Sequence, residues 1–290
     1  MTAIRHDLLE GPSRAHASGR IEAALTDALA RMTSTGCPPR LAQALHHAVF
    51  PGGNRLRPNL CLGVARALGD RHPGVTDAAA AALELVHCAS LVHDDLPAFD
   101  DSPVRRGRPS VHAAFGEALA VLAGDALIIG AFETLALAGG DALAPLTRAL
   151  ARAAGAPHGM CSGQAWESEA DVELARYHRA KTAGMFEAAT MAGAICAGDD
   201  PEPWRALGRH IGEAYQVSDD IRDRLGGVGL GKPVGRDEAK DRPSAVRVLG
   251  LEDAQRLLAR HAESAARSIP LCAGRDALAE RLDAMLRSFS

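Results

Sequence analysis

Aromatic side chains are scarce in this sequence, since Phe, Trp and Tyr together make up 3% of its 290 residues. β-Sheets are enriched in aromatic and β-branched residues, so the composition argues against an all-β fold. Alanine instead accounts for about one fifth of the chain, and alanine is the strongest helix former. We therefore expect helices that pack closely through small side chains.

Motifs typical of several other protein classes are also missing. The six cysteines form no Cys-x-x-Cys pair, which argues against structural zinc and thiol-redox motifs. A net charge of −4 gives no general attraction to nucleic acid. The segment MTAIRHDLLEG lacks an apolar secretory core, and the most apolar stretch, 118–137, carries Asp125 and Glu133. We therefore expect a soluble, cytoplasmic protein without a membrane span.

Apolar residues recur with helical spacing along almost the whole chain, and no convincing strand interrupts them. The expected helices cover 19–32, 41–50, a segment that ends near Leu68, 77–95, 111–137, 141–154, 171–197, 204–224, 251–267 and 275–288. Thr76 and Ser110 are placed to cap two of them. The glycine-rich stretch 226–243 is expected to be a loop, and no linker divides the chain. The pattern predicts one all-α domain over 1–290.

A dense cluster of charge follows the helix expected over 77–95. The aspartates Asp94, Asp95, Asp100 and Asp101 precede three arginines within fifteen residues. These carboxylates end an apolar helix, where the helix dipole disfavours negative charge. Hard cations such as Mg²⁺ take oxygen ligands and share them with substrate phosphates, which arginines also bind. A solvated, self-neutralising loop would explain one such run, but the chain has a second.

The second run, QVSDDIRD, lies at the end of the helix expected over 204–224. Asp219 and Asp223 are four residues apart and so share one helix face, where like charges repel unless a cation bridges them. Gln216 precedes Asp219 and Asp220 by one turn. Two aspartate-rich helix ends in one all-α chain suggest a pocket with metal on both walls.

Several cations and a histidine are candidates for phosphate binding. Arg55 and Arg57 follow a Gly-Gly turn that lets backbone amides approach an anion. His87 lies seven residues before the first aspartate, on nearly the same helix face. The chain has three lysines, of which Lys181 and Lys232 stand where a diphosphate could be reached. Taken alone, each has a structural explanation as well, such as a capped turn or a core histidine.

The motifs together resemble a known family. GGNRLRP, DDLPAFDDSPVRRGRPS, the Lys-Thr pair at 181–182, QVSDDIRD and GKPVGRD follow one another over 52–237. This ordered set is similar to that of the trans-isoprenyl diphosphate synthases, the polyprenyl synthetase family. The segments ELVHCASLVHDDLPAFDD and GKPVGRDEAKDRPSAVRVLGLEDA most resemble bacterial geranylgeranyl diphosphate synthases of carotenoid or bacteriochlorophyll pathways.

The resemblance implies a fold, a reaction and a set of partners. It implies a single polyprenyl synthetase domain, an all-α prenyltransferase bundle with a central cavity, which is usually homodimeric. The implied reaction is a Mg²⁺-dependent condensation of isopentenyl diphosphate with dimethylallyl, geranyl or farnesyl diphosphate. About three Mg²⁺ ions per active site are implied, held by oxygen ligands that are shared with the substrate.

The resemblance also assigns roles to individual residues. The implied metal ligands are Asp94, Asp100, Asp219 and Asp223. The allylic diphosphate would be bound by Arg105, Lys181, Lys232, Thr182 and Gln216. Isopentenyl diphosphate would be bound by Arg57, His87 and Arg106, together with Asn54, which replaces the lysine of the family motif. The implied catalytic set is Asp94, Asp95, Asp100, Arg105, Lys181, Asp219 and Asp220.

The resemblance further implies that product length depends on two residues before the first aspartate motif, Ala89 and Ser90. Bacterial farnesyl diphosphate synthases typically carry an aromatic residue at the position of Ala89, so a small side chain favours geranylgeranyl diphosphate (C20) over farnesyl diphosphate (C15).

Two further functions use a similar scaffold, that of a class I terpene cyclase and that of a non-catalytic subunit of a heteromeric synthase. A cyclase needs metal and an allylic diphosphate but has no site for isopentenyl diphosphate. The GGNRLRP and QVSDDIRD segments therefore argue against a cyclase. The two intact aspartate clusters argue against a non-catalytic subunit, which would be expected to have lost metal carboxylates.

Overall fold

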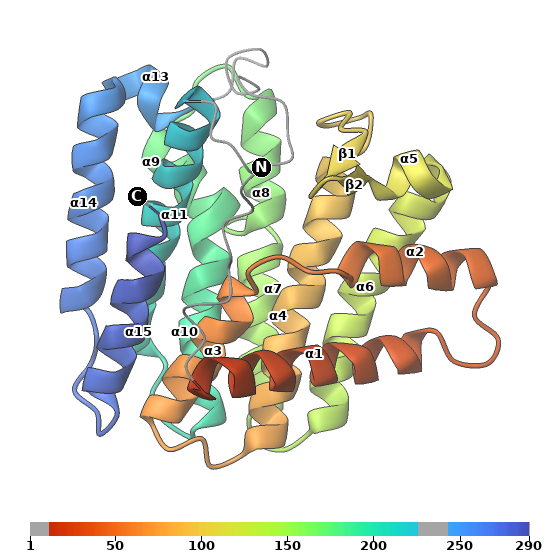
Figure 1. Ribbon diagram of the computed structural model, residues 1–290, viewed down its shortest axis with the longest axis horizontal. Coiled ribbons are helices and arrows are strands. Elements are labelled where there is room, and N and C mark those ends of the chain that lie inside the picture. Colours follow the sequence, from red (N-terminus) through yellow and green to blue (C-terminus); the bar gives the residue numbers. More distant parts are fainter. Residues whose placement is uncertain (1–11, 226–242, 290) are drawn as a thin grey trace, which may run out of the picture.

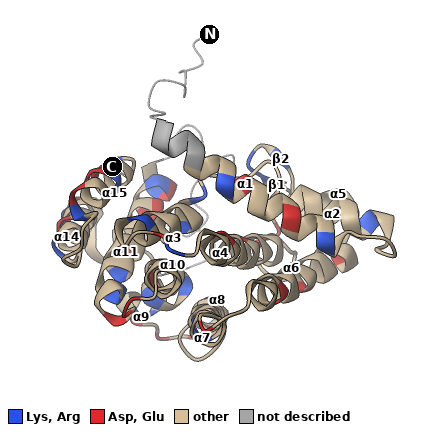
Figure 2. Cartoon of the chain, turned by 90° about the horizontal axis from the view of Figure 1, so that it is seen from below, with Lys and Arg blue, Asp and Glu red and all other residues tan. Residues whose placement is uncertain are grey.

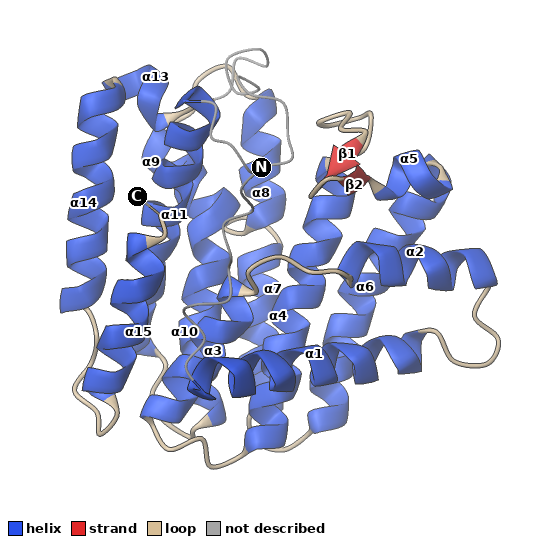
Figure 3. Ribbon diagram, in the orientation of Figure 1, coloured by secondary structure: helices blue, strands red, loops and turns tan. Residues whose placement is uncertain are grey.

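The computed structural model describes residues 12–225 and 243–289, and helices dominate this part of the chain (Figures 1 and 3). The α-helices are α1 (Pro12–Met32), α2 (Pro39–Val49), α3 (Leu56–Ala67), α4 (Pro73–Asp94), α5 (Val111–Phe115), α6 (Glu117–Ala138), α7 (Leu143–Ala154), α8 (Met160–Ala165), α9 (Leu174–His178), α10 (Gly184–Cys196), α11 (Arg205–Leu225), α13 (Ala245–Leu249), α14 (Leu251–Arg267) and α15 (Arg275–Arg287). Short 3₁₀ turns cover Trp166–Ser168 and Glu202–Trp204, and a π-helical turn covers Arg179–Ala183. The all-α prediction is confirmed.

Helix α4 lies at the centre of the bundle, where it contacts α1, α3, α6 and α10. Figure 2 shows these neighbours around it, with most of the upright helices seen end on. The run of alanines over 79–82 is buried on α4, so the surrounding helices can approach closely, as the composition predicts. Close packing at the centre of the bundle therefore fixes the position of α4, the helix that ends at Asp94.

Several expected helices begin or break at other residues. Proline occupies the first turn of α4, which begins at Pro73, so Thr76 lies inside the helix and donates a hydrogen bond to Asp70 Oδ1 at 2.7 Å. Ser110 precedes α5 as expected, but its hydroxyl contacts His112 Nδ1 at 3.0 Å and makes no cap. The helix expected over 111–137 breaks at Gly116, whose φ of 92° suits glycine. The helix expected over 171–197 divides into α9, the π-helical turn and α10.

The expectation that the chain has no strand is wrong for one short hairpin. β1 (Val104–Arg105) pairs antiparallel with β2 (Arg108–Pro109), and Figure 1 shows the pair over the end of α4. Arg106 and Gly107 form the two-residue loop with φ of 54° and 73°. Positive φ at both positions is the signature of a type I′ turn. The hairpin places two consecutive arginines, Arg105 and Arg106, above the first aspartate motif.

Within the described residues, two helices, α4 and α6, meet the length and composition that a membrane crossing requires. Asp125 and Glu133 therefore do not exclude α6 on composition, contrary to the expectation for 118–137. In α4, 67% of the apolar window is buried inside the protein, as in a core helix, but in α6 only 44% is buried. Helix α6 leaves Leu122 and Ile129 exposed, at 53% and 69%. It therefore carries an apolar surface outside the core.

Candidate active site

A cavity of about 640 Å³ opens between the end of α4, the hairpin, α8, α9, the π-helical turn and α11. Most of the residues singled out from the sequence line it. They are Arg57, His87, Ser90, Asp94, Asp100, Arg105, Arg106, Lys181, Thr182, Gln216, Asp219, Asp220 and Asp223. Segments that are far apart in the sequence thus bring their charged side chains to one cavity.

Four carboxylates reach this cavity from two helix ends. Asp94 is the last residue of α4, and the chain folds back so that the Asp100 N–H donates to the Asp94 carbonyl at 2.8 Å. Asp219 and Asp223 come from the last turns of α11. All four line the same cavity, and carboxylate oxygens are the ligands that Mg²⁺ prefers. The donor set therefore fits the expected metal on both walls.

The second aspartate of the first motif is held by an arginine. The Asp95 side chain is 3% exposed, lies outside the cavity lining and accepts hydrogen bonds from Arg105 Nε and Nη2. Burial opposes the charge on Arg105, but Asp95, together with the negative charges of Asp94 and Asp100, outweighs this effect and raises the pKa of Arg105. Asp95 therefore orients Arg105, which does line the cavity.

The second aspartate of the other motif has a comparable set of partners. Asp220 is 2% exposed and accepts a hydrogen bond from Gln216 Nε2 at 2.9 Å and another from the Ala245 N–H at 2.7 Å. Gln216 in turn accepts a hydrogen bond from the Thr182 hydroxyl through its Oε1. Gln216 is expected to support the aspartates of this motif, and it does so by donating a hydrogen bond to Asp220. A continuous polar network joins the π-helical turn to α11 and α13.

Lys181 lies in the π-helical turn, an irregularity that is frequent at functional sites. Its ammonium group pairs with Glu167 and lies 3.1 Å from the Tyr177 hydroxyl. Glu167 also accepts hydrogen bonds from Tyr177 at 2.7 Å and from Gln164 at 2.9 Å. This carboxylate, with a side chain that is 9% exposed, was not singled out from the sequence, and it positions Lys181 at the cavity wall.

Two further arginines, Arg57 and Arg106, line the same cavity. Arg57 lies with its guanidinium carbon 4.7 Å from the centre of the Phe186 ring, and its buried Nε has no hydrogen-bond partner among the described residues. Burial, followed by the positive charges of Arg57 and Arg106, lowers the pKa of His87 well below its ordinary value. A buried arginine nitrogen without a partner, beside a second arginine and a neutral histidine, is suited to bind an anion.

Other candidates lie outside the cavity. Asn54 is exposed, and Ala89 is fully buried in the helical core. Arg55 turns away from the cavity and is buried against Glu22 and Glu84, each 2.8 Å from one of its nitrogens. Lys232 and most of the expected loop over 226–243 lie outside the described residues.

Sequence reasoning missed several residues of the cavity wall. Besides Gln164, these include Tyr177, which precedes Lys181 by one turn, and Tyr215, which precedes Gln216. His93 is a further one, next to Asp94. Helical spacing around Lys181 could have indicated Tyr177, whereas Tyr215 and His93 have no distinctive pattern.

A model of the polyprenyl synthetase family matches residues 38–269. The chain belongs to the polyprenyl synthetase family. It is 54% identical to the geranylgeranyl diphosphate synthase of Cereibacter sphaeroides and 52% identical to that of Rhodobacter capsulatus, and each match covers 90% of this chain and 92% of the relative. The family resemblance stated from the motifs is confirmed.

A solved structure of the same fold is the geranyltransferase from Helicobacter pylori, complexed with magnesium and isoprenyl diphosphate. Its similarity to this chain has a TM-score of 0.80 at 29% identity, over 97% of this chain and 98% of that one. The family match and this structure confirm the prenyltransferase enzyme and its all-α fold.

Proposed function

We propose that this polyprenyl synthetase is a Mg²⁺-dependent geranylgeranyl diphosphate synthase, formed as a single domain over 1–290. It condenses isopentenyl diphosphate with dimethylallyl, geranyl or farnesyl diphosphate and releases a C20 product. The observation that carries the proposal is the convergence of two aspartate-rich helix ends and an arginine cluster on one cavity. The identity to the two geranylgeranyl diphosphate synthases supports the choice of product.

The two substrates are bound by different residues of the cavity. Asp94, Asp100, Asp219 and Asp223 would hold about three Mg²⁺ ions, because their oxygens suit a hard dication. Bound Mg²⁺ supplies positive charge that stabilises the departing allylic diphosphate. Arg105 and Lys181 bind the same diphosphate from the protein side, with Thr182, Gln216 and Lys232 near it.

Isopentenyl diphosphate binds at the arginine cluster. Arg57 and Arg106 pair with its phosphate oxygens, and neutral His87 donates one hydrogen bond. The unpartnered Nε of Arg57 supports this assignment, since a buried cationic nitrogen is costly unless an anion satisfies it. The two diphosphates are therefore bound by different sets of charged residues in one cavity.

The reaction breaks the bond between the allylic carbon and its diphosphate, and the double bond of isopentenyl diphosphate attacks the resulting allylic cation. A proton then leaves the new chain, and an oxygen of the released diphosphate accepts it. Water would capture the cation, so the surrounding wall must be weakly nucleophilic. The apolar residues Val86, Leu91, Ile128 and Met160 line the cavity and supply such a wall.

The apolar face of α6 supports a homodimer. Leu122 and Ile129 are seven residues apart, so they share one face of the helix, and both are exposed. A contiguous exposed apolar face is typical of an interface, and a second copy of the chain would bury it against itself through a two-fold axis. We infer a cytoplasmic dimer in which α6 is covered by its partner, without a membrane span.

The test is an assay of the purified chain alone with Mg²⁺, isopentenyl diphosphate and farnesyl diphosphate. We expect geranylgeranyl diphosphate, identified by chromatography of the dephosphorylated products. A terpene cyclase would consume the allylic diphosphate without isopentenyl diphosphate and release a hydrocarbon or its alcohol. A non-catalytic subunit would be inactive alone, and a farnesyl diphosphate synthase would leave farnesyl diphosphate unextended.

A further inference from the structure

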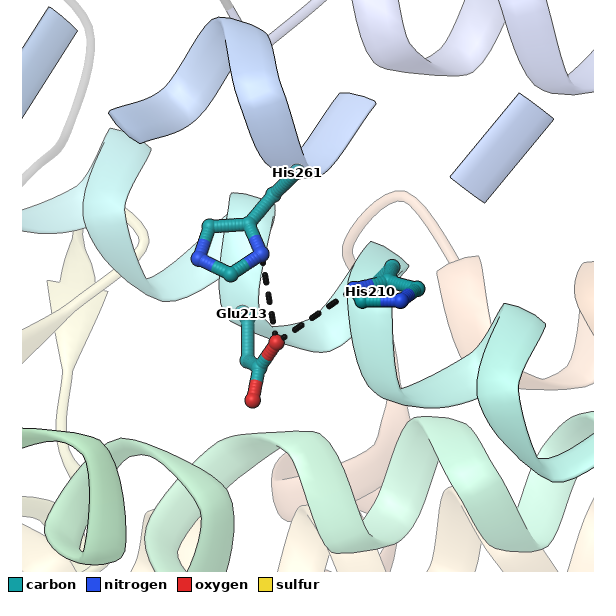
Figure 4. Close-up of side chains that lie close together, drawn as sticks. All are labelled: His210, Glu213 and His261. Atoms are coloured by element: carbon teal, nitrogen blue, oxygen red, sulfur yellow. Dashed lines mark ion pairs between the residues drawn. The ribbon is translucent and has the colours of Figure 1, made fainter. Parts of the chain in front are cut away.

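Two histidines and a glutamate converge on the side of α11 that packs against α14. His210 and Glu213 lie one turn apart on α11, and His261 faces them from α14 (Figure 4). Glu213 Oε2 lies 3.2 Å from His261 Nδ1 and 3.6 Å from His210 Nδ1, so a single carboxylate oxygen faces both rings. None of the three lines the large cavity. The family motifs do not account for this cluster.

The spacing of the three side chains suits a tetrahedral metal ion. Zinc bonds to nitrogen and oxygen are about 2.0–2.2 Å, so two ligand atoms of a tetrahedron lie about 3.3 Å apart. One atom from each of the three residues lies within 4.8 Å of the others, and the two distances to Glu213 Oε2 are already near the tetrahedral value. Small rotations of the partly exposed rings would close the remaining gap.

Two further observations favour a ligand at this cluster. His210 Nδ1 is buried and has no hydrogen-bond partner among the described residues, which is an unfavourable state that a metal bond would relieve. Arg179 faces the other carboxylate oxygen, Glu213 Oε1, at 3.9 Å, which leaves Oε2 turned toward the two histidines.

We propose that His210, Glu213 and His261 bind one divalent transition-metal ion of the Zn²⁺ class, which joins α14 to α11. Two imidazoles and one carboxylate form a ligand set that suits zinc and leaves a fourth position for water. Mg²⁺ prefers oxygen ligands in an octahedral arrangement and is poorly matched to this site. The site is therefore chemically distinct from the aspartate clusters, although both lie on α11.

The joining of helices has a consequence for the active site. Glu213 precedes Asp219 by six residues, which is about 9 Å along the helix. A metal at the cluster would fix α14 against the helix that carries Asp219 and Asp223. We expect the bound ion to raise the melting temperature of the protein, because it binds the folded arrangement and not the unfolded chain.

The test uses the full chain without a polyhistidine tag, treated with a chelator and then titrated with Co²⁺ in saturating Mg²⁺. Mg²⁺ occupies the carboxylate sites, and Co²⁺ in a four-coordinate nitrogen and oxygen site absorbs visible light much more strongly than octahedral Co²⁺. We expect one such Co²⁺ per chain, displaced by one Zn²⁺. His261→Gln, His210→Ala and Glu213→Gln should each weaken binding by at least about tenfold.

His158→Gln is the matched control, since His158 is exposed and distant in sequence from the cluster. It should retain the Co²⁺ spectrum and the rise in melting temperature with Zn²⁺, while His261→Gln loses both with its helical circular dichroism unchanged. Equal Zn²⁺ affinity in the wild type and His261→Gln, or no tetrahedral Co²⁺ spectrum in the wild type, overturns the proposal. These readouts need no prenyltransferase activity, so they stand apart from the proposed reaction.

Discussion

Arg105 and Asp95 form a two-point ion pair under the first aspartate motif, with Arg105 Nε 2.9 Å from one carboxylate oxygen and Nη2 2.5 Å from the other. Asp95 is nearly fully buried, whereas Arg105 reaches the cavity wall. Two parallel hydrogen bonds fix the plane of a guanidinium group. The buried aspartate thus sets the orientation in which the arginine meets a diphosphate.

Asp95→Asn should therefore lower kcat/KM for the allylic diphosphate by about 10- to 100-fold, as is usual when a supporting partner of a functional group is lost. The KM for isopentenyl diphosphate should change little. The folded state should also lose about 3 kcal/mol, because the Arg105 charge is left without its buried partner. Steady-state kinetics and urea unfolding measure the two effects, and a variant with wild-type kinetics would show that Asp95 does not orient Arg105.

The proposed metal ligands make a separate prediction. Asp94→Ala and Asp219→Ala should each reduce turnover by orders of magnitude, about 10³-fold or more, because each removes charge stabilisation from the leaving diphosphate. The helical circular dichroism should be retained. Excess chelator should abolish the activity of the wild type, and added Mg²⁺ should restore it.

Asp101 offers a matched control for these two variants. It belongs to the same aspartate run but is exposed and absent from the cavity wall. Its φ of 46° is readily adopted by asparagine, so Asp101→Asn introduces no strain. This variant should keep turnover within about twofold of the wild type, since exposed substitutions of this kind have small effects. A loss as large as that of Asp94→Ala would mean that the cluster acts by its total charge.

The aspartate motifs could be located from the sequence because helical spacing alone places Asp219 and Asp223 on one face. The ion pair of Lys181 with Glu167 could not be located in this way. Its partner Glu167 belongs to a 3₁₀ turn, and the π-helical turn around Lys181 changes the register between α9 and α10. Such irregular turns depend on tertiary packing, which no periodicity reveals.

The first residues of the helices are likewise hard to predict from local sequence alone. Thr76 has the residue type of a cap, but Pro73 begins α4 one turn earlier, and Thr76 instead satisfies Asp70. No strand is predicted for the hairpin of Arg105 and Arg106, because a two-residue strand is too short for a pattern of alternation. Local sequence therefore locates the helices of this protein more reliably than their first residues or their short connections.

A substitution at Asn54 tests the effect of adding a charge near the proposed isopentenyl diphosphate site. The neighbouring Gly53 lies so close to Arg106 that a Cβ there would be 2.6 Å from Arg106 Nη2. A lysine at position 54 is therefore expected to reach the anion that Arg106 binds. Asn54→Lys should lower the KM for isopentenyl diphosphate by about tenfold or less, as one charge-assisted hydrogen bond allows.

The lowered KM should also become more sensitive to salt, because an exposed charge is screened. Asn54→Gln lengthens the side chain without adding charge and should leave the KM unchanged. If Asn54→Lys leaves the KM unchanged or raises it, position 54 does not face the substrate.

The lowered pKa of His261 predicts how the free energy of unfolding of the metal-free protein depends on pH. Burial, followed by His210 and Arg260, lowers the pKa of His261 from 6.5 to about 4. As the pH falls through this range, the unfolded chain takes up a proton that the folded protein does not, so the free energy of unfolding decreases. Urea unfolding in chelator between pH 7 and about pH 4 should show this decrease. It should be smaller in His261→Gln and unchanged in His158→Gln; equal slopes in all three would contradict the assignment.

Product length is expected to depend on the wall beside Asp94. Ser90 lines the cavity, and its hydroxyl donates to the His87 carbonyl at 2.8 Å. Ala89 is fully buried against neighbouring helices. The wild type should make mainly geranylgeranyl diphosphate. Ser90→Phe places a ring directly in the path of the growing chain, so the product should shift to farnesyl diphosphate, as read by chromatography of the dephosphorylated alcohols.

Ala89→Phe should shift the product in the same direction by a different route. A phenylalanine cannot fit at a fully packed position, so the wall must move toward the cavity, at a cost of about 1–3 kcal/mol in stability. Ser90→Ala keeps the space open and should retain the C20 product. Ser90→Phe should thus shorten the product with the smaller loss of melting temperature. A C20 product from both phenylalanine variants would show that the chain grows along another wall, and a C15 product from the wild type would show that small residues here do not suffice.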